Sequence, residues 1–218
     1  TVAFIGSTGS GKTTLVNLLP RFFDITEGAI RFGDIDIRDV SQKELRDRIG
    51  YVPQKGILFS GTIASNLRYA DESLSDEKVE EALSVSQAKE FVDRMPNGVN
   101  EPIAQGGTNV SGGQKQRLSV ARALAKDAQV YIFDDTFSAL DYATDAKLRA
   151  ALAELITKKH ATVFIVAQRI SSIMHADKII VLDQGKMAGI GTHEELLKSC
   201  EVYQEIAHSQ LSREELGE

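Results

Sequence analysis

Residues 6–13 read GSTGSGKT, and this stretch limits the possible folds more than any other part of the chain. The pattern G-x-x-x-x-G-K-[ST] forms a loop whose backbone N–H groups surround phosphate oxygens, and its glycines supply the backbone freedom that the loop needs. An apolar run, TVAFI, precedes the loop, and a helical pattern, TTLVNLL, follows it. A strand, a glycine-rich loop and a helix in this order predict a phosphate-binding α/β fold.

Further apolar runs of strand length lie at 130–134, 161–167 and 178–183. They are near-continuous rather than alternating, which is typical of parallel strands that are covered on both faces. Between two of these runs, apolar residues from 148 to 156 recur at helical spacing and form one face. The alternation of strands and helices predicts an α/β core with a mostly parallel sheet.

Two segments depart from this alternation. Residues 28–40 alternate apolar and polar side chains around a Gly-Asp turn, which predicts an antiparallel hairpin. Residues 62–127 read as mainly helical, and we expect them to form an inserted helical subdomain. The core, with its β subdomain, would then consist of residues 1–61 and 128–218.

The composition is that of a soluble globular chain, with 42% apolar and 26% charged residues. Since no stretch approaches ~18 uninterrupted apolar residues, we expect no membrane span. The net charge of −6 argues against nucleic acid as the main partner. The single Cys200 cannot form an internal disulfide, which fits a reducing compartment. Because the chain starts inside the first predicted strand, we expect it to be part of a longer protein.

Three more motifs follow the phosphate-binding loop. Residues 51–67 read YVPQKGILFSGTIASNL, residues 110–114 read VSGGQ, and residues 130–135 read VYIFDD. Together with the loop they resemble the nucleotide-binding domain of ATP-binding cassette (ABC) transporters, and the 51–67 stretch resembles the exporter branch. The resemblance covers essentially the whole chain. It implies a P-loop NTPase core, an antiparallel β subdomain truncated at its N-terminus, and an inserted helical subdomain.

The resemblance also implies that the chain binds ATP and Mg²⁺. Lys12 would reach the outer phosphates, while Thr13 and Asp134 would hold Mg²⁺. Gln54 would contact the metal and couple the site to the transmembrane part. Ser111 would contact the γ-phosphate bound by a partner domain. The implied nucleotide-binding residues are Gly6, Ser7, Thr8, Gly9, Ser10, Gly11, Lys12, Thr13, Thr14, Gln54, Ser111, Gly112, Gly113, Gln114 and Asp141.

Two positions depart from the family pattern in the catalytic centre. Asp135 stands where the family has its catalytic glutamate, and it is one methylene shorter. Gln168 stands where the family usually has a histidine that bonds the γ-phosphate, and glutamine cannot carry charge or shuttle a proton. Loss of a positioned base typically costs ~10²–10⁴-fold in rate. A third difference is Gln105, where exporters usually have a glutamate that contacts the transmembrane coupling helices.

This pattern resembles one half of a heterodimeric ABC exporter in which one nucleotide site is degenerate. We therefore predict a weakly hydrolytic ATPase with Asp135 and Gln168 at the catalytic positions. Its partners would be a second nucleotide-binding domain and the transmembrane domains of the same transporter, with no nucleic acid. We expect it at the cytoplasmic face of the cell membrane, although soluble as an isolated domain.

Other functions stay open at this stage. The chain could be a nucleotide-gated dimerisation module without turnover, or part of a homodimeric exporter that tolerates both substitutions. An ABC ATPase of DNA repair or translation is disfavoured, because only about a hundred residues, without sustained heptads, separate the phosphate loop from the signature. Asp141 in the motif SALD is either a helix cap, a residue of a dimer interface, or both.

Overall fold

The computed structural model describes residues 1–212, which fall into two compact units. The first unit comprises residues 1–49, 132–138 and 162 onward, and the second comprises residues 50–131 and 139–161. Among the helices of the described residues, none combines the length and the apolar character that crossing a membrane requires.

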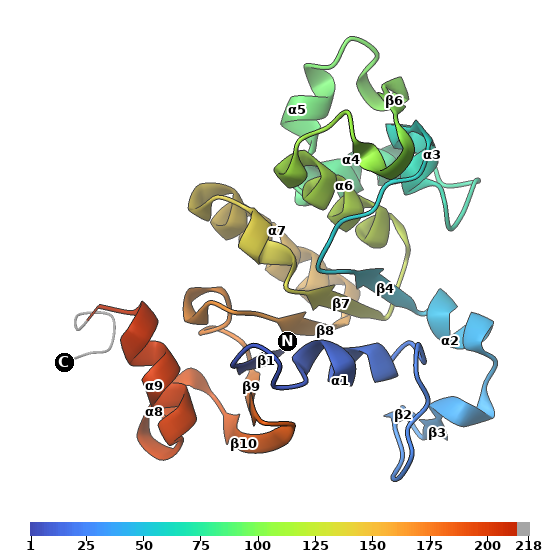
Figure 1. The fold of residues 1–218 in the computed structure, drawn as a ribbon. Helices are drawn as coiled ribbons and strands as arrows, with labels where there is room; N and C mark the ends of the chain where they lie inside the picture. The colour runs from blue at the N-terminus through green and yellow to red at the C-terminus, as the bar shows by residue number, and fades with distance from the viewer. Residues whose placement is uncertain (213–218) are drawn as a thin grey trace. The chain divides into compact units, whose positions relative to one another are not determined.

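The first unit contains a mostly parallel sheet centred on β1, as Figure 1 shows. β8 and β9 flank β1 and run parallel to it, so Ala3 faces Ile165 on one side and Ile179 on the other. β10 pairs with β9 in the antiparallel direction, and β7 follows β8 at the other side. The strands of this unit are β1 (Val2–Gly6), β2 (Arg31–Phe32), β3 (Ile35–Asp36), β7 (Val130–Asp134, residues 132–134 in this unit), β8 (Thr162–Val166), β9 (Lys178–Asp183) and β10 (Lys186–Gly191).

The four apolar runs predicted as buried strands form β1, β7, β8 and β9, and the predicted α/β fold with a mostly parallel sheet is confirmed. All five residues of β7 are buried, as a strand covered on both faces requires. β10 was not predicted from the sequence. It is an edge strand with an irregular register, and its Met187 and Ile190 are exposed, so it lacks a continuous apolar run.

Helices cover this sheet and carry the segments that follow the strands. α1 packs against β1 and β8, α8 packs against β10, and α9 packs against β1 and β9 (Figure 1). The Nδ1 atom of His193 on α8 lies 2.7 Å from the hydroxyl of Tyr203 on α9 and joins these two helices. The helices are α1 (Lys12–Leu18), α2 (Gln42–Asp47), α8 (His193–Ser199) and α9 (Glu201–Gln210), with the 3-10 turns η1 (Ile37–Asp39), η4 (Thr136–Ala139) and η5 (Ile170–Ser172).

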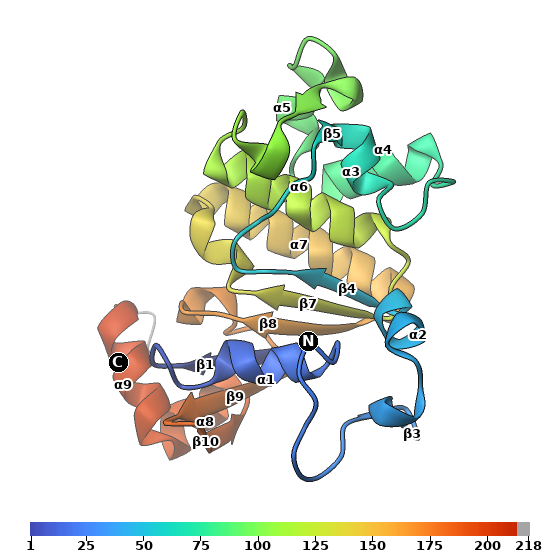
Figure 2. The same cartoon turned by 45° about the vertical axis from the view of Figure 1, so that its right-hand side comes forward.

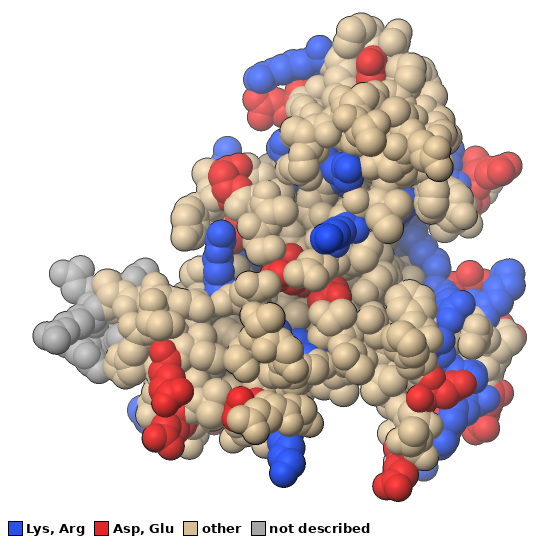
Figure 3. Space-filling model, viewed as in Figure 1, with Lys and Arg blue, Asp and Glu red and all other residues tan. Residues whose placement is uncertain are grey.

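The predicted hairpin within residues 28–40 is confirmed, because β2 and β3 pair in the antiparallel direction. Basic and acidic side chains alternate over the surface formed by this hairpin and α2, as Figure 3 shows. Arg38 pairs with Asp36, and Lys43 pairs with Asp47 one helical turn away. These charges therefore largely satisfy one another.

The second unit is built around α6, which packs against α3 and α4, while α4 also contacts α5 and α7 (Figure 2). The predicted apolar face at 148–156 lies on α7, where Leu148, Leu152 and Leu155 are buried. The limits that we predicted for a helical subdomain, 62–127, stay a prediction. The elements are β4 (Ile49–Val52, residues 50–52 in this unit), β5 (Gly61–Thr62), β6 (Pro102–Ile103), α3 (Ile63–Leu67), α4 (Asp76–Val85), α5 (Lys89–Asp93), α6 (Gly112–Ala125) and α7 (Tyr142–Lys159), with η2 (Gly98–Asn100) and η3 (Gln105–Gly107).

Candidate functional site

The phosphate-binding loop joins β1 to α1 in the first unit, and three of its positions require glycine. A Cβ atom on Gly6 would lie 2.0 Å from the backbone oxygen of Leu182, so no side chain fits there. Gly9 and Gly11 have φ angles of 81° and 97°, in the left-handed region that glycine adopts without strain. The loop is thus shaped by its glycines, as the motif predicted.

The turn between β9 and β10 also binds the loop. The amide of Gly185 donates a hydrogen bond to the carbonyl of Ser10 at 3.2 Å, and the amide of Ser10 donates to the carbonyl of Ser7 at 3.1 Å. Around this framework, Ser7, Thr8 and Gly9 are exposed to solvent. A fixed backbone with an exposed rim suits a ligand that binds to main-chain N–H groups.

Lys12 is the buried cation of this loop, with 8% of its surface exposed. Its Nζ donates hydrogen bonds to the carbonyls of Gly6 and Ser7 at 2.7 and 2.8 Å, and to the Ser10 hydroxyl at 3.3 Å. Burial lowers its pKa, while the carboxylates of Asp135 and Asp134 oppose that shift. A buried ammonium group whose closest contacts are neutral oxygens fits an anionic ligand such as a phosphate.

Thr13 and Asp134 meet at the next position, where a divalent cation would bind. The Thr13 hydroxyl donates a hydrogen bond to Oδ1 of Asp134 at 2.9 Å, although 121 residues separate them. Among the described residues, no group of three or more His, Cys, Asp or Glu side chains is arranged so that it could hold a metal ion. One hydroxyl and one carboxylate fit Mg²⁺, which uses few protein ligands and completes its shell with water and phosphate oxygens.

Asp135 and Gln168, the two positions that depart from the family pattern, contact each other directly. The Gln168 side-chain amide donates a hydrogen bond to Oδ2 of Asp135 at 2.5 Å. Asp135 is buried and has a φ angle of 45°, a left-handed conformation that aspartate tolerates better than most residues. Its backbone amide donates to the carbonyl of Val166 at 3.0 Å, so β8 fixes its place. The Asp135 carboxylate is therefore already engaged by an amide.

Gln210, at the end of α9, contacts the same segment and was not singled out from the sequence. Its Nε2 donates to the carbonyl of Gln168 at 2.8 Å, and its Oε1 accepts from the amide of Ile170 at 2.8 Å. One side chain thus binds the main chain on both sides of Arg169. A contact between residues 42 positions apart has no local sequence pattern, so only the structure could identify it.

The signature residues lie in the second unit, where Ser111 is the N-cap of α6. Its hydroxyl accepts from the amide of Gln114 at 3.2 Å, and the Gln114 side chain accepts from the amide of Ser111 at 2.9 Å. This reciprocal capping box fixes the start of the helix. Ser111 and Gly112 are exposed to solvent, while Gly113 is half-buried.

Three other predicted residues also lie in the second unit. Gln54 is exposed in the segment after β4, and Gln105 is exposed at the start of η3. Asp141 is the N-cap of α7 and accepts a hydrogen bond from the amide of Thr144 at 2.9 Å. That backbone N–H lowers the pKa of the Asp141 carboxyl. The predicted helix cap is therefore confirmed, and a role of Asp141 in an interface stays a prediction.

The first unit thus brings together Lys12, Thr13, Asp134, Asp135 and Gln168, at the ends of three neighbouring strands. A mostly parallel sheet with a glycine-rich loop after β1 and a carboxylate pair at the end of β7 defines a P-loop NTPase fold.

Comparison with protein families identifies the branch of these NTPases. The family model described as "ABC transporter" matches residues 1–138, and the chain belongs to this family. It is 48% identical over 213 residues to an uncharacterized ABC transporter ATP-binding protein of Mycobacterium bovis, covering 96% of this chain and 36% of that protein. It is 42% identical over 209 residues to the ATP-dependent lipid A-core flippase of Desulfotalea psychrophila, again covering 96% of this chain and 36% of the relative.

A solved structure gives the same result for the fold. The chain matches a bacterial Atm1-family ABC exporter with ATP bound, with a TM-score of 0.92 and 36% sequence identity. The match covers 97% of this chain and 37% of the exporter chain. The chain thus spans little more than one third of the length of the proteins that it resembles.

Proposed function

We propose that the chain is the ATP-binding part of an ABC exporter, and that it pairs with a second nucleotide-binding domain around ATP. Its similarity to a lipid A-core flippase and to an Atm1-family exporter supports the exporter branch. The remaining two thirds of such a protein would hold the transmembrane domains, and in this proposal the chain would lie at the cytoplasmic face of a membrane. The transported substrate would be set by those domains.

The phosphate-binding loop would hold the β- and γ-phosphates of ATP. Lys12 would turn its Nζ from the loop carbonyls toward the outer phosphates, where a charge-assisted hydrogen bond is stronger than a neutral one. Thr13 and Asp134 would hold Mg²⁺, with Gln54 as a further contact to the metal. The chemistry that Mg²⁺ would supply when bound is positive charge, which offsets the negative charge of phosphoryl transfer.

We propose that hydrolysis at this chain's own site is slow, and the contact between Asp135 and Gln168 is the observation that carries this proposal. A general base must come within ~2.6–3.2 Å of the water that it activates. Aspartate is shorter than glutamate by one carbon–carbon bond, ~1.5 Å. The Asp135 carboxylate also accepts the Gln168 amide at 2.5 Å, so it is held by a group that cannot accept or shuttle a proton. The site would bind ATP firmly and turn it over slowly.

The signature would serve the site of the partner domain. Ser111 and Gly112 are exposed at the start of α6, a helix of 14 residues. A helix N-terminus carries partial positive charge, which favours a phosphate. In this proposal the chain supplies an intact signature to a competent site on its partner, and the pair works as a heterodimer.

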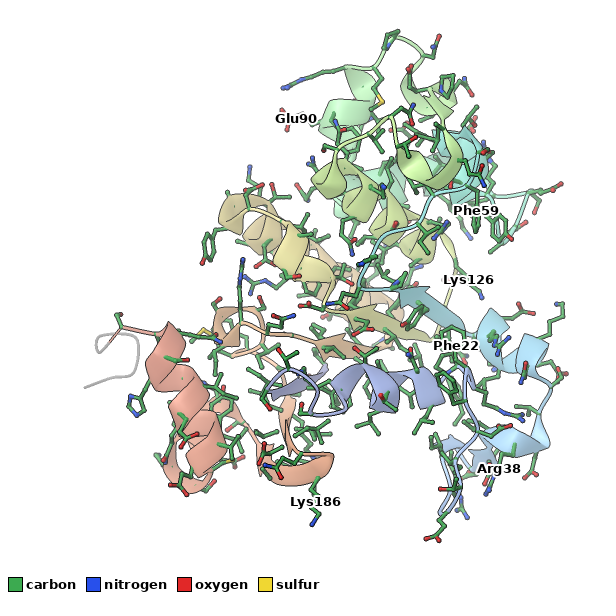
Figure 4. The ribbon with its side chains drawn as sticks, viewed as in Figure 1. Phe22, Arg38, Phe59, Glu90, Lys126 and Lys186 are labelled. Atoms are coloured by element: carbon green, nitrogen blue, oxygen red, sulfur yellow. The ribbon has the colours of Figure 1, made fainter. Side chains whose placement is uncertain are left out.

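Nucleotide binding by the full-length protein tests the function directly. Lys12→Ala should weaken the binding of Mg·ATP by at least tenfold, because it removes a desolvated cation from the phosphate site. Lys186→Ala is the matched control, because Lys186 is exposed on β10 and its side chain points away from the protein in Figure 4. Titration with a fluorescent ATP analogue would measure both variants. Equal affinity of the two variants would mean that the loop does not bind nucleotide.

A further inference from the structure

The segment that carries Gln54 rests on α6 through one buried amide. The amide of Gly56 donates a hydrogen bond to Oε1 of Gln116 at 3.0 Å, and Nε2 of Gln116 lies 3.5 Å from the carbonyl of Pro53. Gln116 is 3% exposed, so little water competes for these contacts. Pro53 and Gly56 enclose Gln54 and Lys55 in the chain. The Gln116 side chain therefore spans the turn on which Gln54 is displayed.

The backbone of this turn packs closely against α6 at Gly56. A Cβ atom on Gly56 would lie 2.9 Å from Oε1 of Gln116 and 2.8 Å from the hydroxyl of Ser119, one helical turn further along. Ser119 is 1% exposed. A larger residue at position 56 would therefore displace the side chains of Gln116 and Ser119, or the turn itself.

The other end of the segment is held as well. The side chain of Asn66 on α3 accepts from the amide of Phe59 at 2.8 Å and donates to its carbonyl at 2.9 Å. The guanidinium of Arg122 on α6 lies 5.0 Å from the centre of the Phe59 ring, at a distance typical of a cation–π contact. Figure 4 labels Phe59 on this segment. The segment is therefore fixed at Phe59, and Gln116 determines where its first half lies.

The same helix carries the signature. Ser111 caps α6, and Gln116 follows five residues later on the rigid helix that the capping box starts. A displacement of the turn at 53–56 would therefore act on α6 at a point just over one turn from Ser111.

We infer that Gln116 is a positioning residue: it sets the turn that presents Gln54, and so couples Gln54 to the signature helix. This inference rests on the proposed function, in which Gln54 contacts Mg²⁺. Replacing a residue that holds a metal ligand in position, without touching the metal itself, typically weakens metal affinity by roughly 10–100-fold. Replacement of Gln116 by an apolar residue would also leave the half-buried amide of Gly56 without its acceptor.

The test compares Gln116→Leu and Gln116→Glu in the full-length protein. Calorimetry would measure the Mg²⁺ affinity in the presence of a non-hydrolysable ATP analogue, and hydrogen exchange would follow the Gly56 amide. Gln116→Leu should weaken Mg²⁺ binding by roughly 10–100-fold and speed exchange at Gly56, while metal-free binding of the analogue stays unchanged. Gln116→Glu keeps an acceptor for the Gly56 amide and should recover most of the affinity. Gln129→Leu, the same change at an exposed position beyond α6, should alter neither readout.

A second variant keeps the inference testable if Gln116→Leu does not fold. Gly56→Ala should disturb the contact between the turn and α6 and weaken Mg²⁺ binding in the same direction. If Gln116→Leu binds Mg²⁺ with unchanged affinity, Gln116 is only a packing residue and the inference is wrong. If Gln116→Leu does not fold, unchanged Mg²⁺ affinity in Gly56→Ala leads to the same conclusion. Unchanged Mg²⁺ affinity in these variants, together with the expected loss of ATP binding in Lys12→Ala, would overturn only this inference. Retained ATP binding in Lys12→Ala would overturn the proposed function itself.

Discussion

Changing Asp135 and Gln168 to the residues usual in the family should raise ATP turnover fully only when both changes are made together. Asp135→Glu alone adds ~1.5 Å of reach. The Asp135 carboxylate is already 2.5 Å from the Gln168 amide, so no space is left between them for the longer glutamate side chain. Nor can the Gln168 segment move back, because Gln210 binds it at two points, each at 2.8 Å, and the Ala167 amide donates to the Phe4 carbonyl at 3.0 Å.

The expected size of the effect follows from these contacts. In Asp135→Glu alone, Gln168 would displace the glutamate carboxylate from the attacking water, so the rate of ATP hydrolysis should rise less than about tenfold. A correctly positioned base contributes ~10²–10⁴-fold in rate. The double variant with Gln168→His should approach that gain. A tenfold departure from additivity corresponds to about 1.4 kcal/mol of coupling, within the range of roughly 0.5–3 kcal/mol for residues in direct contact.

The assay is a double-mutant cycle of steady-state ATP hydrolysis in the full-length protein with its partner. Every member of the cycle would carry Ser111→Ala, which in the proposed arrangement silences the partner's site and leaves this chain's own site visible. Single-turnover phosphate release would separate chemistry from product release. A full gain from Asp135→Glu alone, or no gain from the double variant, would refute the argument from geometry.

Two further predictions concern packing and the clamp on the Gln168 segment. Gly50→Ala should lower the free energy of unfolding by about 1–3 kcal/mol, because the added Cβ would lie 2.6 Å from the buried Tyr131 ring and 3.0 Å from the Ala123 carbonyl. An unchanged melting temperature in calorimetry would contradict this prediction. Gln210→Leu should speed hydrogen exchange at the Ile170 amide, which loses its acceptor. Gln204→Leu on the same helix should not change that exchange rate. Equal exchange in both variants would show that Gln210 does not bind the Ile170 amide in solution.

Features that depend on local sequence could be predicted without the structure. The apolar runs of β1 and β7 identify strands buried on both faces, and the glycines of the phosphate-binding loop mark the positions with special backbone angles. Asp141 in the motif SALD was named as a possible helix cap, and it caps α7. Each of these signals involves residues within a few positions of one another.

Features that depend on contacts between distant residues could not be predicted. The hydrogen bond between Asp135 and Gln168 spans 33 positions, and the contact between Gly56 and Gln116 spans 60. Both arise because strands or helices bring separate segments together, and nothing in the local pattern marks the partner. β4 and β10 were missed for another reason: one is short, with a glycine in it, and the other is an exposed edge strand with an irregular register.

We propose that this chain holds ATP at its own site while its signature drives hydrolysis at the site of its partner. The most direct measurement is ATP turnover of Ser111→Ala and of Asp135→Ala, each in the full-length protein with an unmodified partner. Removal of one donor to the developing charge typically costs ~10²–10³-fold, so Ser111→Ala should nearly abolish turnover. Asp135→Ala should cost less than about tenfold and leave ATP retained at this site. If Asp135→Ala proves as damaging as Ser111→Ala, this chain's own site is a working catalytic centre and the claim is wrong.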